Sequence, residues 1–194
     1  MLSPSPDARF EALLAAEADG RDLPPFLAFW GHTAKADHAG PWVLSQWWPT
    51  PFQVDGVTYR HAESFMMAAK ARLFDDSDML EQILASEHPG EAKKLGRQVQ
   101  GFDEAVWQTQ CYAIVVAANV AKFAQSASLR AYLLSTAPQV LVEASPRDRI
   151  WGVGLGPDNP KVNTPSQWRG RNLLGFALTE VRERLSASEG DRRG

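Results

Sequence analysis

A glutamate and a lysine stand seven residues apart in an otherwise largely apolar segment, residues 62–74. Seven residues are close to two turns of α-helix, so Glu63 and Lys70 would project from the same side, about 10 Å apart along the axis. Met66 and Met67 lie between them, and methionine is a residue of protein interiors. A buried carboxyl can shuttle a proton, and a desolvated amine can attack a carbonyl. The segment indicates a pocket wall, with a structural ion pair or two independent surface groups as the alternative.

A second carboxylate, Asp148, lies between two predicted strands in the sequence Ala144-Ser-Pro-Arg-Asp-Arg-Ile-Trp-Gly152. The two flanking arginines would keep it ionised, which suits an anion placed near a developing positive charge. The alternative is a turn aspartate that bonds to its own backbone, which is common after Ser-Pro. Asp148 is therefore a candidate catalytic residue whose role the sequence leaves open.

Tryptophan is unusually frequent, with seven residues in a chain of 194. Trp lines cores and ligand pockets with a large planar surface, so each candidate below fits the core as well as a ligand contact. The aromatic candidates for binding a base are Trp107, Trp151 and Trp168. The cationic candidates for binding phosphate are Arg97, Lys122, Arg169 and Arg171, although surface positions would explain them equally well. Arg169, Arg171 and Asn172 directly precede a predicted helix, whose amino end favours anions.

Composition and absent motifs exclude several classes of protein. The net charge of −3 argues against general nucleic-acid binding, which needs a strongly basic face. The single Cys111 excludes an internal disulfide and a cysteine metal cluster, and the four histidines lack ligand spacing, so we expect no metal. No phosphate-binding or dinucleotide-binding glycine motif and no nucleophile elbow is present. Without a signal peptide or a run of about 18 apolar residues, we expect a cytoplasmic protein without a membrane partner.

Local signals predict the elements that must position these side chains. Asp7 and Asp103 are candidate helix caps, and Asp55-Gly56 suits a two-residue hairpin turn. Residues 154–170 are rich in Gly, Pro and Asn and too long for a plain connector, so we expect a binding loop there. Helices are predicted at 7–18, 62–74, 78–85, 89–97, 104–123, 128–135 and 172–185, with strands at 26–30, 52–59 (a hairpin), 140–143 and 150–153.

The pattern predicts an α+β fold: a compact single domain, mainly helical, with a small sheet. A doubly wound architecture is disfavoured because strands do not alternate regularly with helices. We expect residues 1–25 to form a leader and a short helix, 26–185 the domain, and 186–194 a frayed tail.

Many short motifs follow one another in unbroken order along the chain. They are Leu44-Ser-Gln-Trp-Trp-Pro-Thr-Pro-Phe52, Asp55-Gly56, Tyr59, the block from Glu63 to Lys70, Gly96-Arg97, Gly101-Phe-Asp-Glu104, Trp107, Lys122-Phe123, Leu141-Val-Glu-Ala-Ser-Pro146, Asp148, Trp151-Gly152, Trp168-Arg-Gly170 and Asn172-Leu-Leu-Gly175. Together they resemble the NADAR (YbiA-like) domain family over roughly residues 26–185. Ser64 stands where an aromatic residue or His is expected, and Trp48 where Phe is also common. These departures bear on the choice of substrate.

The resemblance implies an N-glycosidase with the small, mainly helical α+β fold of that family. Such an enzyme hydrolyses the bond between a ribose and the nitrogen of a base or amine. The implied substrates are phosphoribosylamino-pyrimidine intermediates of riboflavin synthesis, or ADP-ribose attached to guanine in a nucleotide or nucleic acid. No cofactor or metal is implied. The alternative is a non-catalytic module that binds ADP-ribose or another nucleotide.

The same resemblance carries functional roles to Glu63, Lys70, Trp107 and Asp148. Cleavage of a ribose–nitrogen bond builds positive charge on the sugar, and a nearby carboxylate lowers that barrier. Our hypothesis gives this role to Asp148 or Glu63, with the other carboxyl transferring the proton. Lys70 would trap the ring-opened sugar aldehyde as a Schiff base, and Trp107 would stack on the base or wall the pocket.

Overall fold

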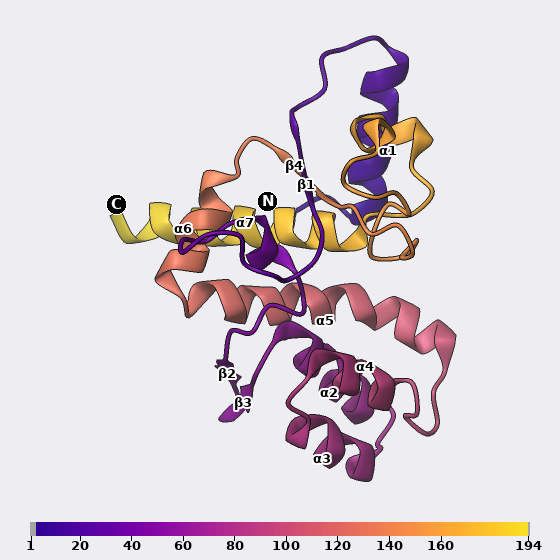
Figure 1. The fold of residues 1–194 in the computed structure, drawn as a ribbon, viewed down its shortest axis with the longest axis vertical. Coiled ribbons are helices and arrows are strands. Elements are labelled where there is room, and N and C mark those ends of the chain that lie inside the picture. Colours follow the sequence, from indigo (N-terminus) through magenta and orange to yellow (C-terminus); the bar gives the residue numbers. More distant parts are fainter. Residues whose placement is uncertain (1–2, 194) are drawn as a thin grey trace. The chain divides into compact units, whose positions relative to one another are not determined.

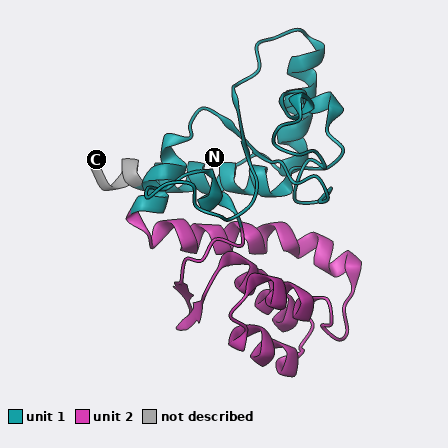
Figure 2. Ribbon diagram, viewed as in Figure 1, with its two compact units in different colours: residues 1–45, 128–194 teal, residues 46–127 magenta. Residues whose placement is uncertain are grey.

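Helices make up most of this chain. The structure is a computed structural model that describes residues 3–193, with side chains described as far as Ser188. Within these residues, seven α-helices, three 3-10 helices and four short strands follow one another (Figure 1). The predicted α+β class, mainly helical with little sheet, is confirmed. The chain forms two compact units: unit 1 comprises Met1–Ser45 with Ser128–Gly194, and unit 2 comprises Gln46–Ala127 (Figure 2).

Unit 2 is built around helix α2, which packs against three other helices of the same unit. Its helices are α2 (Ala62–Leu73), α3 (Ser77–Ala85), α4 (Pro89–Gly96) and α5 (Glu104–Ala124). Asp103 caps α5, because its side chain accepts a hydrogen bond from the Val106 N–H, as predicted. The middle of α5 is buried at Val115 and Val116, which places this helix in the core of the unit.

A hairpin precedes α2 in unit 2. Strands β2 (Phe52–Val54) and β3 (Val57–Tyr59) pair antiparallel, with Phe52 opposite Tyr59. Asp55 and Gly56 both have positive φ, 50° and 77°, which a two-residue type I′ turn requires. The predicted turn is confirmed.

Unit 1 combines a two-stranded parallel sheet with three α-helices and three short 3-10 helices. Strands β1 (Phe26–Phe29) and β4 (Val140–Glu143) pair in register from Phe26 with Val140 to Phe29 with Glu143. The helix α7 (Leu173–Arg193) packs on β4. The other helices of the unit are α1 (Pro6–Ala18), α6 (Ala127–Ser135) and the short 3-10 helices η1 (Pro41–Leu44), η2 (Pro160–Asn163) and η3 (Pro165–Gln167).

The structure corrects two predicted helix ends. Ser5, rather than Asp7, caps α1, because its side chain accepts from the Ala8 N–H. Pro6 follows at the first helical position, where a missing N–H costs nothing. Helix α7 continues to Arg193, past the expected end near residue 185, so most of the expected frayed tail is helical. Gly194 lies outside the described residues.

The strand predicted at 150–153 is wrong. Its backbone bonds to several segments in turn rather than to one neighbouring strand. The Val153 N–H donates to the Glu143 carbonyl, and the Val153 carbonyl accepts from the Arg169 N–H, both at 2.9 Å. Ile150 is exposed, so the apolar run does not mark a buried strand.

Helix α1 holds the glycine- and proline-rich loop that follows. The ring of Phe10 stacks on Trp168 with centroids 5.6 Å apart and planes 4° from parallel. The Glu17 carboxylate accepts from the Ser166 N–H at 3.0 Å and from its hydroxyl at 2.7 Å. The loop predicted for binding is therefore fixed from one side by the N-terminal helix.

Candidate active site

The start of α2 places Glu63 in the interior of unit 2. His61 caps the helix, since its Nδ1 accepts from the Ser64 N–H at 3.0 Å and its carbonyl accepts from the Ser64 hydroxyl at 2.7 Å. Glu63 follows in the first turn, and its N–H donates to the Gln46 carbonyl at 3.0 Å. Its side chain is only 5% exposed. The carboxyl is thus buried at the end of a helix where the macrodipole favours negative charge.

Lys70 lies two turns further along α2, where its amine meets a carbonyl and two aromatic rings. Nζ donates a hydrogen bond of 2.7 Å to the carbonyl of Gly96, the last residue of α4. It also lies 3.9 Å from the ring centroid of Phe102 and 5.8 Å from that of Trp107. Burial lowers the pKa of the Lys70 amine. The carbonyl, the helix end and the rings all favour the cation, so they oppose this effect.

The close approach of α4 to α2 brings that carbonyl within reach. A side chain at Gly96 would overlap the side chain of Met67 on α2, so glycine leaves room for Met67 where α4 packs against α2. Met66 and Met67 are both buried between Glu63 and Lys70, as the sequence predicted. The buried carboxyl and the half-buried amine thus share a largely apolar helix side.

Lys122 on α5 is fully buried, with an exposed fraction of 0%. Burial lowers the pKa of its amine to about 7. Nζ lies 5.0 Å from the ring centroid of Phe123. We expected this amine to contact a substrate phosphate. That contact stays a prediction, and the complete burial of the side chain does not support it.

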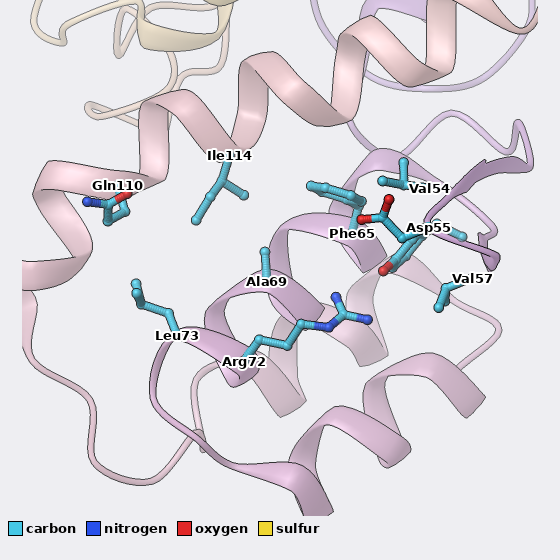
Figure 3. Close-up of a pocket in the computed structure, with 10 residues that line it drawn as sticks. Val54, Asp55, Val57, Phe65, Ala69, Arg72, Leu73, Gln110 and Ile114 are labelled. Atoms are coloured by element: carbon cyan, nitrogen blue, oxygen red, sulfur yellow. The ribbon is translucent and has the colours of Figure 1, made fainter.

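The opposite side of α2 faces a different environment. A hollow of about 600 Å³ lies between α2, the hairpin and α5 (Figure 3). Phe65, Ala69 and Arg72 line it from α2, and Gln110 and Ile114 line it from α5. The residues that line this hollow include neither Glu63 nor Lys70. The hollow beside this helix is therefore not where its candidate chemistry lies.

In unit 1, Asp148 forms the kind of turn that the sequence left open as an alternative. One carboxylate oxygen accepts from the Ile150 N–H at 2.9 Å and from the Trp151 N–H at 2.8 Å. The Asp148 carbonyl also accepts from the Gly154 N–H at 3.0 Å. Asp148 thus organises its own loop, and its catalytic role stays a prediction.

The remaining candidates in unit 1 make structural contacts. Trp168 packs against Phe10 and donates from its indole N–H to the Val162 carbonyl at 2.9 Å. The Asn172 amide donates to the Leu141 carbonyl and accepts from the N–H of Glu143, both at 2.9 Å, so it completes the hydrogen bonding of β4. Substrate contacts of these two side chains stay predictions.

The predicted site residues divide between the two units. Unit 2 holds Glu63, Lys70, Arg97, Trp107 and Lys122, and unit 1 holds Asp148, Trp151, Trp168, Arg169 and Asn172. Lys70 and Trp107 are brought together within unit 2, and Asp148 and Trp151 within unit 1. Arg97 is exposed directly after Gly96, and Arg169 is exposed beside Trp168.

Two residues that contact the Lys70 amine were not identified from the sequence. Phe102 and Gly96 both occur in the motifs of the resemblance, but no role was given to either. The Gly101-Phe102-Asp103 sequence before a helix could have indicated an exposed ring at the start of α5. Every residue has a backbone carbonyl, so the sequence does not indicate that the carbonyl of Gly96 accepts this hydrogen bond. Among the side chains described, those of residues 3–188, no three His, Cys, Asp or Glu gather in an arrangement that could hold a metal ion. No helix in the described part of the chain is long and apolar enough to span a bilayer.

Comparison with known proteins gives one family and several relatives. The family model described as NADAR domain matches residues 28–186. N-glycosidase R617 of Acanthamoeba polyphaga mimivirus is 39% identical over 158 residues, which cover 78% of this chain and 92% of that protein. N-glycosidase YbiA of Escherichia coli K12 is 35% identical over 136 residues, which cover 70% of this chain and 76% of that protein.

Two further comparisons extend this set. The NMR structure of the E. coli protein YbiA matches with a TM-score of 0.69 and 30% identity, over 85% of this chain and 87% of that one. The chloroplastic riboflavin biosynthesis protein PYRR of Zea mays is 35% identical over 138 residues, which cover 68% of this chain but 20% of that protein.

Proposed function

Because the chain belongs to the NADAR domain family, we propose that it hydrolyses the bond between a ribose and the nitrogen of a base or amine. Its relatives R617 and YbiA are named N-glycosidases, and the chain is accordingly a hydrolase of N-glycosyl bonds. The ribose carries either a phosphate or an ADP group. The observation that carries the proposal is the buried carboxyl of Glu63 on the same side of α2 as the Lys70 amine.

The proposed chemistry begins with cleavage of the bond between C1′ and nitrogen. The bonding electrons leave with the nitrogen, and positive charge develops on C1′ and the ring oxygen. A water then adds its oxygen to C1′ and gives up a proton, which ends on the leaving nitrogen. Glu63 suits this proton transfer because its carboxyl is buried in the wall of unit 2. Asp148, by resemblance, is the second carboxylate of the hypothesis.

Lys70 acts after the sugar ring opens. The ring-opened product presents an aldehyde at C1′, and the neutral amine adds to it and releases water to form an imine. Hydrolysis of the imine returns the amine and the sugar. The lowered pKa of Lys70 supports this role, since it enlarges the fraction of neutral amine.

The two substrate classes are distinguished by a direct assay. Purified protein is incubated with a phosphoribosylamino-pyrimidine and, separately, with ADP-ribosylated guanosine, and release of the sugar is measured. A preference of about a hundredfold in kcat/KM, roughly 2.7 kcal/mol of transition-state binding, identifies the substrate. The name of the maize relative favours the pyrimidine.

The roles of the carboxyls are tested in the same assay. We expect Glu63→Gln to lower kcat by about 10² to 10⁴, the usual contribution of a general acid or base. Asp148→Asn, which keeps the shape of the turn, tests the second carboxylate separately. Wild-type rates in folded Glu63→Gln protein would contradict the role of Glu63. Tight binding of ADP-ribose without turnover of either substrate would instead identify a nucleotide-binding module.

A further inference from the structure

An exposed aromatic ring lies against the candidate reactive amine. Phe102 is 44% exposed, yet its ring centroid is 3.9 Å from Lys70 Nζ, closer than the ring of Trp107 at 5.8 Å. A large apolar side chain gains little stability from such an exposed position. Its contact with the amine indicates that the ring acts on Lys70 rather than on the stability of the fold.

We propose that Phe102 is a positioning residue for Lys70, which holds the amine against the Gly96 carbonyl and aims it at the sugar. The inference rests on the proposed function, in which Lys70 reacts with the sugar aldehyde. Neither the family comparison nor the named relatives give Phe102 a role.

The ring is itself held in place from two sides. Phe74, the C-cap residue directly after α2, meets it edge to face with centroids 5.4 Å apart and planes 69° from parallel. Gly101, directly before it, has a φ of 65°, a left-handed conformation that glycine adopts without strain. Phe102 is thus fixed to the end of the helix that carries Lys70, and this geometry lets it direct the amine.

Three groups that attract a cation meet at this one amine: the Phe102 ring, the Trp107 ring and the Gly96 carbonyl at the carboxyl-terminal end of α4. They favour the charged form of the amine and restrict its movement. Replacement of the ring by an aliphatic side chain of similar size would keep the burial and remove the attraction. The amine would then lose its proton at a lower pH and move more freely.

The test uses Phe102→Leu and the reactivity of the amine toward a small aldehyde, without substrate. Glycolaldehyde and cyanoborohydride modify lysines reductively, and mass spectrometry follows Lys70 across pH, with exposed Lys94 as the internal reference. A cation–π contact of the usual strength predicts that the midpoint for Lys70 falls by about half a pH unit, so that modification at pH 7 becomes roughly two- to fivefold faster.

Two variants serve as matched controls. Phe102→Tyr keeps an aromatic ring and is expected to retain the wild-type profile. Val106→Ala truncates another exposed apolar side chain, 42% exposed, in the first turn of α5 and is expected to leave Lys70 unchanged. An unshifted Lys70 profile in Phe102→Leu, or an equal shift in Val106→Ala, would overturn the inference.

Turnover separates this inference from the proposed function. Positioning predicts that Phe102→Leu lowers kcat about tenfold although its amine is more reactive, and that Phe102→Tyr restores kcat. Unchanged kcat in Phe102→Leu would remove the positioning role. Full activity of Lys70→Ala would instead remove the Schiff base from the proposed function, and the aldehyde profile would still decide whether Phe102 holds the amine.

Discussion

The two sides of α2 differ in what they expose and in what they could do. One side carries Glu63, two buried methionines and Lys70, and its amine has defined partners on α4 and at the start of α5. The other side carries Phe65, Ala69 and Arg72 and faces a hollow of about 600 Å³. The charged groups that line the hollow, Asp55 and Arg72, are exposed. In this helix, the candidate reactive residues are therefore identified by the burial of their polar groups and not by the volume of a neighbouring pocket.

The sharpest test of this difference replaces one cation on each side. We expect Lys70→Ala to abolish the sugar adduct that borohydride traps on the wild-type protein, because the nucleophilic amine is lost. Arg72→Ala removes a guanidinium 5.8 Å from the Tyr59 ring and should leave the yield of this adduct within about threefold of the wild type. Mass spectrometry of both folded variants after borohydride reduction measures the adduct. Similar losses in the two variants would show that the two sides do not differ in function.

Helix α5 extends the comparison, since Gln110 and Ile114 face the hollow whereas Lys122 is fully buried. The pKa of Lys122 is lowered to about 7, so above pH 7 the unfolded chain binds more protons at this residue than the folded chain. Stability should therefore rise with pH from about 7 toward the ordinary pKa of lysine, by at most about 1.4 kcal/mol per pH unit. Below pH 7 the contribution is constant.

Urea unfolding of the wild type and of Lys122→Met at pH 7 and pH 9 measures this contribution. Relative to the wild type, the free energy of unfolding of Lys122→Met should be higher at pH 7 than at pH 9. The wild type should become more stable between pH 7 and pH 9, and the variant should not show this increase. Lys94→Met, which removes an exposed lysine of α4, is the control. Equal pH dependence of wild type and Lys122→Met would contradict the expectation.

The smallest expected effect compares two neighbouring alanines of α2. Ala68 is fully buried, so Ala68→Leu should overpack the core and lower the free energy of unfolding by about 1–3 kcal/mol. Ala69 lines the hollow, so Ala69→Leu should change it by no more than about 0.5 kcal/mol. Thermal or urea unfolding of the two variants gives both values. A costly Ala69→Leu would show that the hollow is closed in solution.

Local signals sufficed for many of the elements around the site. The Asp55-Gly56 turn depends on residues that tolerate positive φ, and the Asp103 cap depends on a side chain that bonds to the nearby backbone, so the sequence contains both interactions. The side of α2 shared by Glu63 and Lys70 follows from helical spacing alone. The fold class followed from the dominance of helical patterns over short strands.

Tertiary contacts account for what the sequence could not predict. The run Ile150-Trp-Gly-Val153 has the composition of a strand, but its backbone partners are Glu143 and the stretch 169–174 that leads into α7. The Lys70 acceptor is the backbone carbonyl of Gly96, which no residue type in the sequence marks as a partner. No linker in the sequence marks the boundaries of the two compact units at Ser45 and Ser128.

The order of the units along the chain has a consequence for synthesis on the ribosome. Unit 2 is one continuous stretch, whereas the paired strands β1 and β4 of unit 1 come from before and after it. A growing chain therefore exposes β1 without its partner while the whole of unit 2 emerges and folds. An unpaired strand edge promotes aggregation, so nascent chains that stall after unit 2 should depend on chaperones more than chains released at full length.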